Sequence, residues 1–126
     1  MNKLLLIILL FISCENNKGE FQLLEYQSYK SHIENNSVQL FDVRTPEEYN
    51  LGHIKGAVNI DFKNEEIFYS SFEKVDKFKP VYLYCRSGNR SKKSADKLIK
   101  LGFSRVYDLK GGFIEWNLNE PKKINF

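Results

Sequence analysis

Cys85 is followed by two arginines in the segment Cys85-Arg-Ser-Gly-Asn-Arg-Ser91, which joins an apolar run to a helical pattern. A cysteine becomes a nucleophile as its thiolate, which nearby positive charge and free backbone amides favour. Arg86 and Arg90 carry charges that do not titrate in proteins. Gly88 allows the positive φ angle with which successive amides can converge on an anion. The segment therefore predicts that Cys85 is a thiolate nucleophile in an anion-binding loop.

The other polar residues of this loop have short side chains, which can shape the loop and contact a ligand. The predicted substrate-binding residues around the cysteine are Arg86, Ser87, Gly88, Asn89, Arg90 and Ser91. A small anion with a leaving group suits this arrangement. The two histidines lie far from the loop in sequence, and we interpret both His32 and His53 as structural. A protease site of the cysteine and histidine type is therefore poorly supported.

Strand and helix patterns alternate along the chain and must position this loop. Strands are predicted at residues 38–43, 57–60, 81–84 and 105–109, and helices at residues 24–35, 45–52, 64–75, 92–101 and 113–117. Strands joined by helices of this length predict an α/β fold with a mainly parallel sheet covered on both faces. Ligands bind at the carboxyl ends of the strands of such sheets. Cys85 follows the strand that we expect to be most central, because its residues are all apolar or aromatic.

The helix at residues 45–52 shows clear start signals. Thr45 is suited to cap it, and Pro46 takes the first helical position. Glu47 and Glu48 fall in its first turn, where we interpret them as solvated partners of the helix dipole.

The composition is that of an ordinary globular protein. The chain has 126 residues, of which 42% are hydrophobic and 28% charged, so we expect one domain with one core, acting as a monomer. The net charge is +3, and lysines alternate with acidic residues along the chain. A nucleic-acid binder needs a basic stripe, so no nucleic-acid partner is predicted.

The first residues have a different character from the rest. A positive charge at Lys3 precedes nine apolar residues at 4–12, and Ser13 precedes Cys14. Nine helical residues span only about 14 Å, too short for a hydrocarbon core of about 30 Å, so residues 1–13 are predicted to be a signal peptide.

Phe11-Ile-Ser-Cys14 resembles the lipobox of bacterial lipoproteins, although its first position is more often leucine. The resemblance implies that Cys14 becomes the acylated amino terminus and anchors the chain to a membrane. Residues 14–20 are then a polar tether and residues 21–126 the domain. The protein would be exported to the bacterial cell envelope, on the periplasmic side, with Cys85 as its one free thiol.

Four segments in order carry a second resemblance, which covers residues 22–117. They are Phe41-Asp-Val-Arg-Thr-Pro-Glu-Glu-Tyr49, Gly52-His-Ile-Lys-Gly-Ala-Val-Asn-Ile60, Val81-Tyr-Leu-Tyr-Cys-Arg-Ser-Gly-Asn-Arg-Ser91 and Leu109-Lys-Gly-Gly-Phe-Ile-Glu-Trp116. Together they are similar to a single-domain rhodanese. The resemblance implies a rhodanese-like fold with a five-stranded sheet.

The resemblance also implies a sulfurtransferase. Cys85 would take a sulfur atom from a small anionic donor such as thiosulfate, hold it as a persulfide, and pass it to a thiol or to cyanide. The persulfide is the covalent intermediate, so neither a cofactor nor a metal ion is expected. Asp42 and Arg44 match the family's Asp-Val-Arg motif, and we expect them to support the site, most simply as an ion pair at a strand end.

The loop has two alternative functions besides sulfur transfer. Related phosphatases and arsenate reductases have five residues between the cysteine and the arginine, whereas four separate Cys85 from Arg90. The shorter loop favours a bowl sized for one sulfur atom over one for a tetrahedral phosphate. The other alternative is a rhodanese-like module that binds or senses sulfide or oxidants without turnover.

Overall fold

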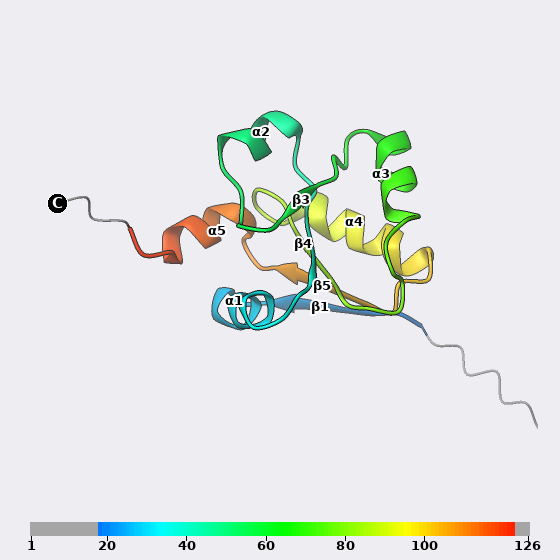
Figure 1. The fold of residues 1–126 in the computed structure, drawn as a ribbon, viewed down its shortest axis with the longest axis horizontal. Coiled ribbons are helices and arrows are strands. Elements are labelled where there is room, and N and C mark those ends of the chain that lie inside the picture. The colour runs from blue at the N-terminus through cyan, green and yellow to red at the C-terminus, as the bar shows by residue number, and fades with distance from the viewer. Residues whose placement is uncertain (1–17, 123–126) are drawn as a thin grey trace, which may run out of the picture.

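The carboxyl ends of five parallel strands meet along one edge of a single sheet. The computed structural model describes residues 18–122 (Figure 1). The strands are β1 (Glu20–Leu24), β2 (Gln39–Asp42), β3 (Val58–Asn59), β4 (Val81–Tyr84) and β5 (Arg105–Leu109). Their order across the sheet is β1-β5-β4-β2-β3, and all neighbours pair in parallel. The predicted α/β class with a five-stranded parallel sheet is confirmed.

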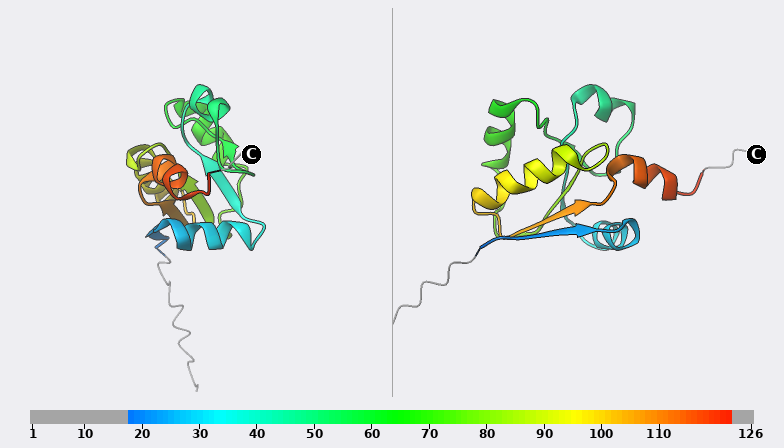
Figure 2. Two further views of the ribbon diagram at one scale, coloured as in Figure 1. Left: turned by 90° about the vertical axis from the view of Figure 1, so that its left-hand side faces the viewer. Right: turned by 180° about the vertical axis from the view of Figure 1, so that it is seen from behind.

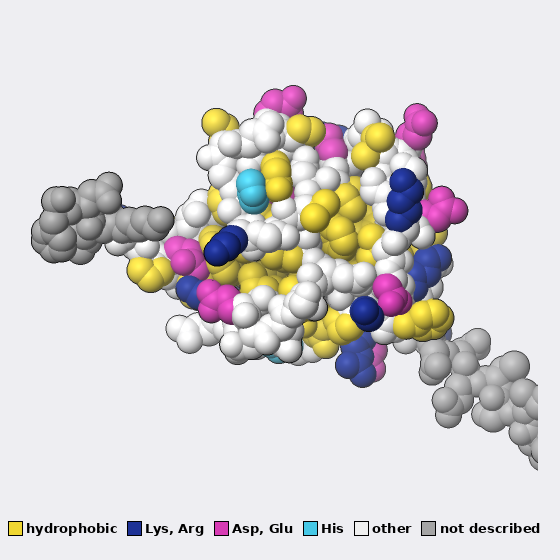
Figure 3. Space-filling model, viewed as in Figure 1, with side chains coloured by type: hydrophobic (Ala, Val, Ile, Leu, Met, Phe, Trp, Pro, Cys, Tyr) yellow, Lys and Arg dark blue, Asp and Glu magenta, His cyan; other side chains and the backbone are white. Residues whose placement is uncertain are grey.

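Helices cover both faces of this sheet, and each face has its own core. The helices are α1 (Tyr26–Glu34), α2 (Pro46–Leu51), α3 (Glu65–Phe72), α4 (Asn89–Lys100) and α5 (Gly112–Asn119). Buried side chains of α3 and α4 pack on one face, and those of α1 and α5 pack on the other. Figure 2 shows α4 and α1 on opposite sides of the sheet. Figure 3 shows hydrophobic side chains gathered over the middle of one surface, with charged side chains around them.

Strand β4 is the most enclosed element. All four of its residues are buried, and it lies between β5 and β2. Because side chains alternate along a strand, Val81 and Leu83 enter one core and Tyr82 and Tyr84 the other. The loop that begins at Cys85 therefore leaves from the middle of the sheet edge, as predicted.

The sequence pattern was wrong at the start of the domain. The predicted helix at residues 24–35 begins later, at Tyr26, and Leu24 ends the unpredicted strand β1. β1 has only five residues, four of them exposed, and it pairs with β5, which lies 85 positions later in the chain, so no local pattern indicated it. Glu20, assigned to the tether, is the first residue of β1, and its amide donates to Ser104 O at 2.9 Å.

Several predictions concern residues outside those that the structure describes. They are the signal peptide at residues 1–13, the acylated Cys14 and the tether as far as residue 17. Within residues 18–122, no helix is both long enough and apolar enough to cross a membrane.

Candidate active site

The Cys85 sulfur lies beneath a short loop at the carboxyl end of β4. The residue is 1% exposed, and its Sγ accepts hydrogen bonds from the Gly88 amide at 3.0 Å and from Ser91 Oγ at 3.4 Å. Ser91 Oγ also lies 3.2 Å from Gly88 O. The loop thus folds back so that one backbone amide and one hydroxyl group face the sulfur.

Helix α4 begins earlier than the sequence pattern predicted. Gly88 is its N-cap with a φ of 113°, a left-handed conformation that favours glycine, and the helix runs from Asn89. The predicted loop residues Asn89, Arg90 and Ser91 therefore form the first turn of α4. Their amides point out of the helix N-terminus without intrahelical partners. The positive end of the helix is thus brought directly to the sulfur.

Several loop amides have no hydrogen-bond partner among residues 18–122. The amides of Arg86, Ser87, Asn89, Arg90 and Ser91 donate to no other residue in the described part of the chain. Such a run of unpaired amides at a helix N-terminus is the usual setting for a bound anion. The loop therefore has the backbone geometry that the prediction requires, and anion binding itself stays a prediction.

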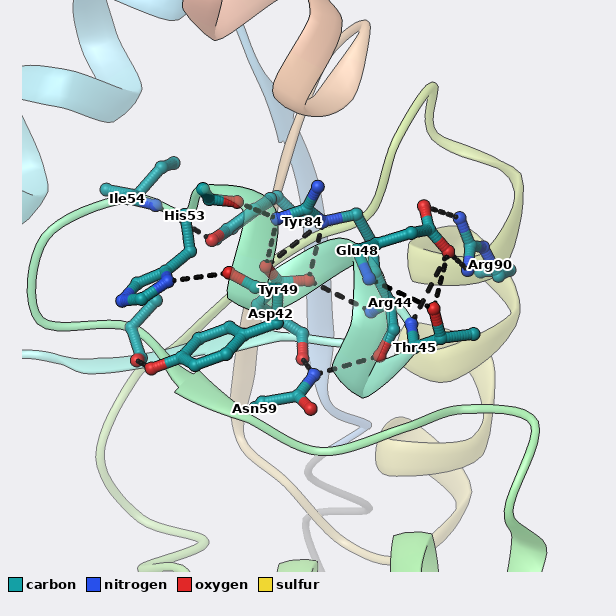
Figure 4. A network of polar contacts seen from close by, with 12 residues as sticks. Asp42, Arg44, Thr45, Glu48, Tyr49, His53, Ile54, Asn59, Tyr84 and Arg90 are labelled. Carbon is teal, nitrogen blue, oxygen red and sulfur yellow. Dashed lines mark hydrogen bonds and ion pairs between the residues drawn. The ribbon is translucent and has the colours of Figure 1, made fainter.

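The two arginines beside Cys85 have different environments. Arg86 is exposed and forms no ion pair with any residue at 18–122, whereas Arg90 forms a bidentate pair with Glu48. The Arg90 nitrogens lie 2.7 and 2.9 Å from the two Glu48 carboxylate oxygens (Figure 4). Arg90 holds the pKa of Glu48 at about 2, and Glu48 in turn raises the pKa of Arg90. The charge of Arg90 is therefore largely neutralised within the protein.

Glu48 has a different role from the one predicted. It is a partner of the helix dipole, but its carboxylate also holds Arg90 and completes a capping box with Thr45. The start signal at Thr45 and Pro46 thus determines where this carboxylate lies. The pairing of Glu48 with Arg90 joins residues 42 positions apart, so no local sequence pattern could have indicated it.

Asp42 and Arg44 form a buried ion pair at the carboxyl end of β2, as expected. Arg44 Nη2 contacts Asp42 Oδ2 at 2.6 Å and Gly52 O at 2.7 Å, and Asp42 is fully buried. The Arg44 guanidinium also stacks over the Phe113 ring at 4.2 Å. The pair thereby joins β2 to the turn at Gly52 and to α5. Figure 4 shows the Asp42 carboxylate and the Arg44 guanidinium facing each other.

The amino terminus of α5 holds the opposite side of the Cys85 loop. The amides of Phe113 and Ile114 donate to the carbonyls of Cys85 and Arg86, at 2.8 and 3.1 Å. Gly112 permits this approach, because a Cβ at that position would come within 2.6 Å of both carbonyl oxygens. The sequence indicated a tight glycine turn here, but not that it contacts the loop.

The loop rim opens into a hollow of about 250 Å³. Arg44, Glu48 and Arg86 line it together with apolar side chains of Leu51, Phe113 and Ile114. A larger hollow of about 750 Å³, between α1, α5 and the turn at residues 53–56, contains no residue of the Cys85 loop. The smaller hollow is therefore the one that adjoins the Cys85 loop, through Arg86.

The remaining loop residues and the two histidines do not hydrogen-bond to the Cys85 sulfur. The side chains of Ser87 and Asn89 are exposed and form no hydrogen bond with another residue at 18–122, so they do not brace the loop. His32 contacts the Tyr82 hydroxyl, and His53 stacks on Tyr49, both away from Cys85. In the described part of the chain, no group of three His, Cys, Asp or Glu side chains could hold a metal ion.

Residues 25–119 match the family model of the rhodanese-like domain, and the chain belongs to that family. It is 38% identical over 89 residues to the thiosulfate sulfurtransferase GlpE of Pseudomonas paraeruginosa, covering 71% of this chain and 78% of that protein. It is 34% identical over 114 residues to a tRNA uridine(34) hydroxylase of Pelagibacter ubique, covering 90% of this chain. The chain spans 37% of the length of that hydroxylase and 60% of Bacillus subtilis YqhL, two of the first curated relatives it matches.

Solved structures show the same fold. The reduced Bacillus anthracis CoADR-RHD superposes with a TM-score of 0.71 at 28% identity, covering 84% of this chain and 18% of that one. The human single-domain sulfurtransferase TSTD1 gives a TM-score of 0.70 at 24% identity, covering 79% of this chain and 97% of that one. The second likeness concerns the fold alone.

Proposed function

We propose that the protein is a sulfurtransferase that carries a sulfur atom on Cys85, from a small anionic donor such as thiosulfate to a thiol acceptor. The observation that carries the proposal is the position of the sulfur, which accepts from the Gly88 amide among loop amides that have no partner in the part of the chain that the structure describes. Membership of the rhodanese-like family and the likeness to a thiosulfate sulfurtransferase support it.

The chemistry needs two displacements at sulfur. The Cys85 thiolate attacks the outer sulfur of thiosulfate, the bond to the sulfite group breaks, and sulfite leaves with the bonding electron pair. The persulfide then bears one negative charge on its outer sulfur, where the unpaired amides can stabilise it. An acceptor thiolate next attacks that outer sulfur, and Cys85 leaves as a thiolate, which restores the starting state.

Arg86 is the cation that we assign to the donor. It is exposed beside the loop and lines the hollow, whereas Arg90 is already paired with Glu48. A dianionic donor entering this hollow would meet the charge of Arg86 before it reached the amides. Ser87 and Asn89 lie exposed on the same rim and are free to contact the donor.

Mass spectrometry of the full chain after incubation with thiosulfate tests the proposal. We expect Cys85 to gain one sulfur atom, which cyanide then removes as thiocyanate. Cys85→Ser should abolish the gain and lower thiocyanate formation by at least about 10³-fold, with unchanged circular dichroism, because the nucleophile alone is lost. Absence of the sulfur gain would refute the proposal. A stable gain that no acceptor removes would instead favour the binding or sensing module.

We also propose that the chain is a lipoprotein, on the strength of residues 1–14 alone. Palmitate labelling in a bacterial host should mark the wild-type chain and not the Cys14→Ala variant. Labelling that persists in the variant would refute the anchor and leave the sulfur chemistry untouched.

A further inference from the structure

Asp108 is a buried carboxyl group on the same face of the sheet as Cys85. It pairs in register with Leu83, and Cys85 follows Leu83 by two positions, so all three side chains project toward α4. Asp108 is 1% exposed, and its Oδ1 has no hydrogen-bond partner in the described part of the chain. Burial of a carboxylate oxygen without a hydrogen-bond partner lowers the stability of the fold, so its presence here requires an explanation.

The groups around Asp108 include no paired cation. Burial raises the pKa of Asp108 to about 7, while the Ser91 hydroxyl and the Leu109 amide act in the opposite direction. From α1, the Tyr29 hydroxyl donates to Leu83 O at 2.9 Å, and after burial the charge of Asp108 raises its pKa further. From α4, Arg90 turns to Glu48. Asp108 can therefore exist in either protonation state near neutral pH.

Ser91 lies between the carboxyl group and the sulfur. Its hydroxyl has one hydrogen, which faces two acceptors, Cys85 Sγ at 3.4 Å and Gly88 O at 3.2 Å. The same hydroxyl also acts on the Asp108 carboxyl group, whose pKa it lowers. The hydroxyl cannot donate to all three groups at once. Whether the Ser91 hydroxyl donates to Cys85 or to Asp108 must depend on which of the two bears the negative charge.

We propose that Asp108 is a positioning residue that shares a proton with Cys85 through the Ser91 hydroxyl. The proposal rests on the assigned role of Cys85 only in taking its sulfur as the reacting atom. When the thiol ionises, its proton passes to Ser91 Oγ, and the Ser91 hydroxyl proton passes to the Asp108 carboxylate. One negative charge moves from Asp108 to the sulfur, and no proton leaves the protein.

The transfer changes the orientation of Ser91. A protonated Asp108 donates to Ser91 Oγ, which commits the Ser91 hydrogen to the thiolate. An ionised Asp108 competes for that hydrogen and adds a like charge near the sulfur, so it opposes the thiolate. The same hydrogen bond from Ser91 would also stabilise the negatively charged persulfide. Each half-reaction leaves a negative charge on sulfur at this position, first on the persulfide and then on the Cys85 thiolate.

The test is the pH dependence of Cys85 alkylation by iodoacetamide in the full chain, read by peptide mass spectrometry so that Cys14 does not contribute. Two coupled steps are expected for the wild-type chain. Asp108→Asn removes the competing charge but can still donate to Ser91, so we expect a single step, with alkylation near pH 7 faster by about threefold or more. Asp96→Asn, an exposed carboxylate on α4, should match the wild type.

The Ser91→Ala background separates a relay from simple repulsion. If Ser91 carries the coupling, Asp108→Asn should change alkylation much less in that background. An equal change in both backgrounds, or an Asp108→Asn profile identical to the wild type, would overturn the proposal. Neither measurement needs sulfur transfer, so failure of the transferase assignment would be seen separately.

A reciprocal measurement does not depend on the folding of Asp108→Asn. The carboxyl carbon of Asp108 can be titrated by NMR in the wild type and in Cys85→Ser, whose hydroxyl does not ionise. Linkage requires the midpoint of Asp108 to fall when the titrating thiol is removed. An unchanged midpoint would refute the shared proton.

Discussion

The carboxyl ends of the neighbouring strands β2 and β4 both carry charged groups, but they are organised in opposite ways. At β2, Asp42 and Arg44 are buried and satisfy each other. At β4, the loop amides have no acceptor among the described residues, and Arg86 is exposed. A cluster whose charges are fully paired holds elements in place, whereas an incomplete one has capacity left for a ligand. The contrast places the chemistry at β4 and the support at β2.

The largest effect on stability should come from breaking the β2 cluster. Asp42→Asn leaves the Arg44 guanidinium buried without its anion, which should lower the free energy of unfolding by about 3–5 kcal/mol. Urea unfolding measures this, with Asp96→Asn as a control at an exposed site. Sulfur transfer by the folded fraction should change little. A loss below about 1 kcal/mol would show that the pair is not a structural support.

Gly112→Ala tests the contact that holds the β4 loop from α5. A Cβ there would collide with the carbonyls of Cys85 and Arg86, so the loop must move. We expect Gly112→Ala to lower the free energy of unfolding by about 1–3 kcal/mol more than Gly56→Ala does. We also expect it to lower the rate of sulfur transfer at least about tenfold. Gly56 has a similar φ of 85° but no atom within 4 Å of such a Cβ, so it controls for backbone strain. Equal effects of the two variants would contradict the contact.

Substitutions of Arg86 and of Arg90 should have different effects on the donor and acceptor half-reactions. Arg86→Ala should raise the KM for thiosulfate about tenfold and leave the acceptor step unchanged, because Arg86 lines the hollow and forms no ion pair with another described residue. Arg90→Ala should instead affect both half-reactions and lower stability, because Glu48 loses its partner. Lys93→Ala controls for the loss of one exposed positive charge on α4. The assignment fails if Arg90→Ala alone impairs donor use.

The smallest effect concerns acid stability. The folded-state pKa of Glu48 is about 2, below its ordinary 4.5, so its ion pair adds stability above pH 4.5 that disappears as the pH falls toward 2. Glu48→Gln should cost about 1 kcal/mol at pH 7, since the pair is partly exposed, and nothing near pH 2. Unfolding by urea across this pH range measures the difference. Glu47→Gln in the same turn should show no such trend.

Much of the architecture could be predicted because it depends on local patterns. The apolar run of β4, the cap at Thr45 and the loop around Gly88 each lie within a few residues. The pattern did not reveal β1, an edge strand whose residues are mostly exposed and which forms only by pairing with β5. It also placed the start of α4 too late, because a glycine N-cap and polar first turn give no apolar periodicity.

The sequence by itself determined the fold class, the nucleophile candidate and the order of its neighbours, since these follow from residue type and short spacing. The tertiary structure decided which charged groups are neutralised within the protein and which can interact with a ligand. Glu48 neutralises Arg90 from another helix, α5 holds the loop carbonyls, and Asp108 comes to lie behind Ser91. Electrostatic interactions act through space, so segments distant in the chain determine how two arginines in one loop differ.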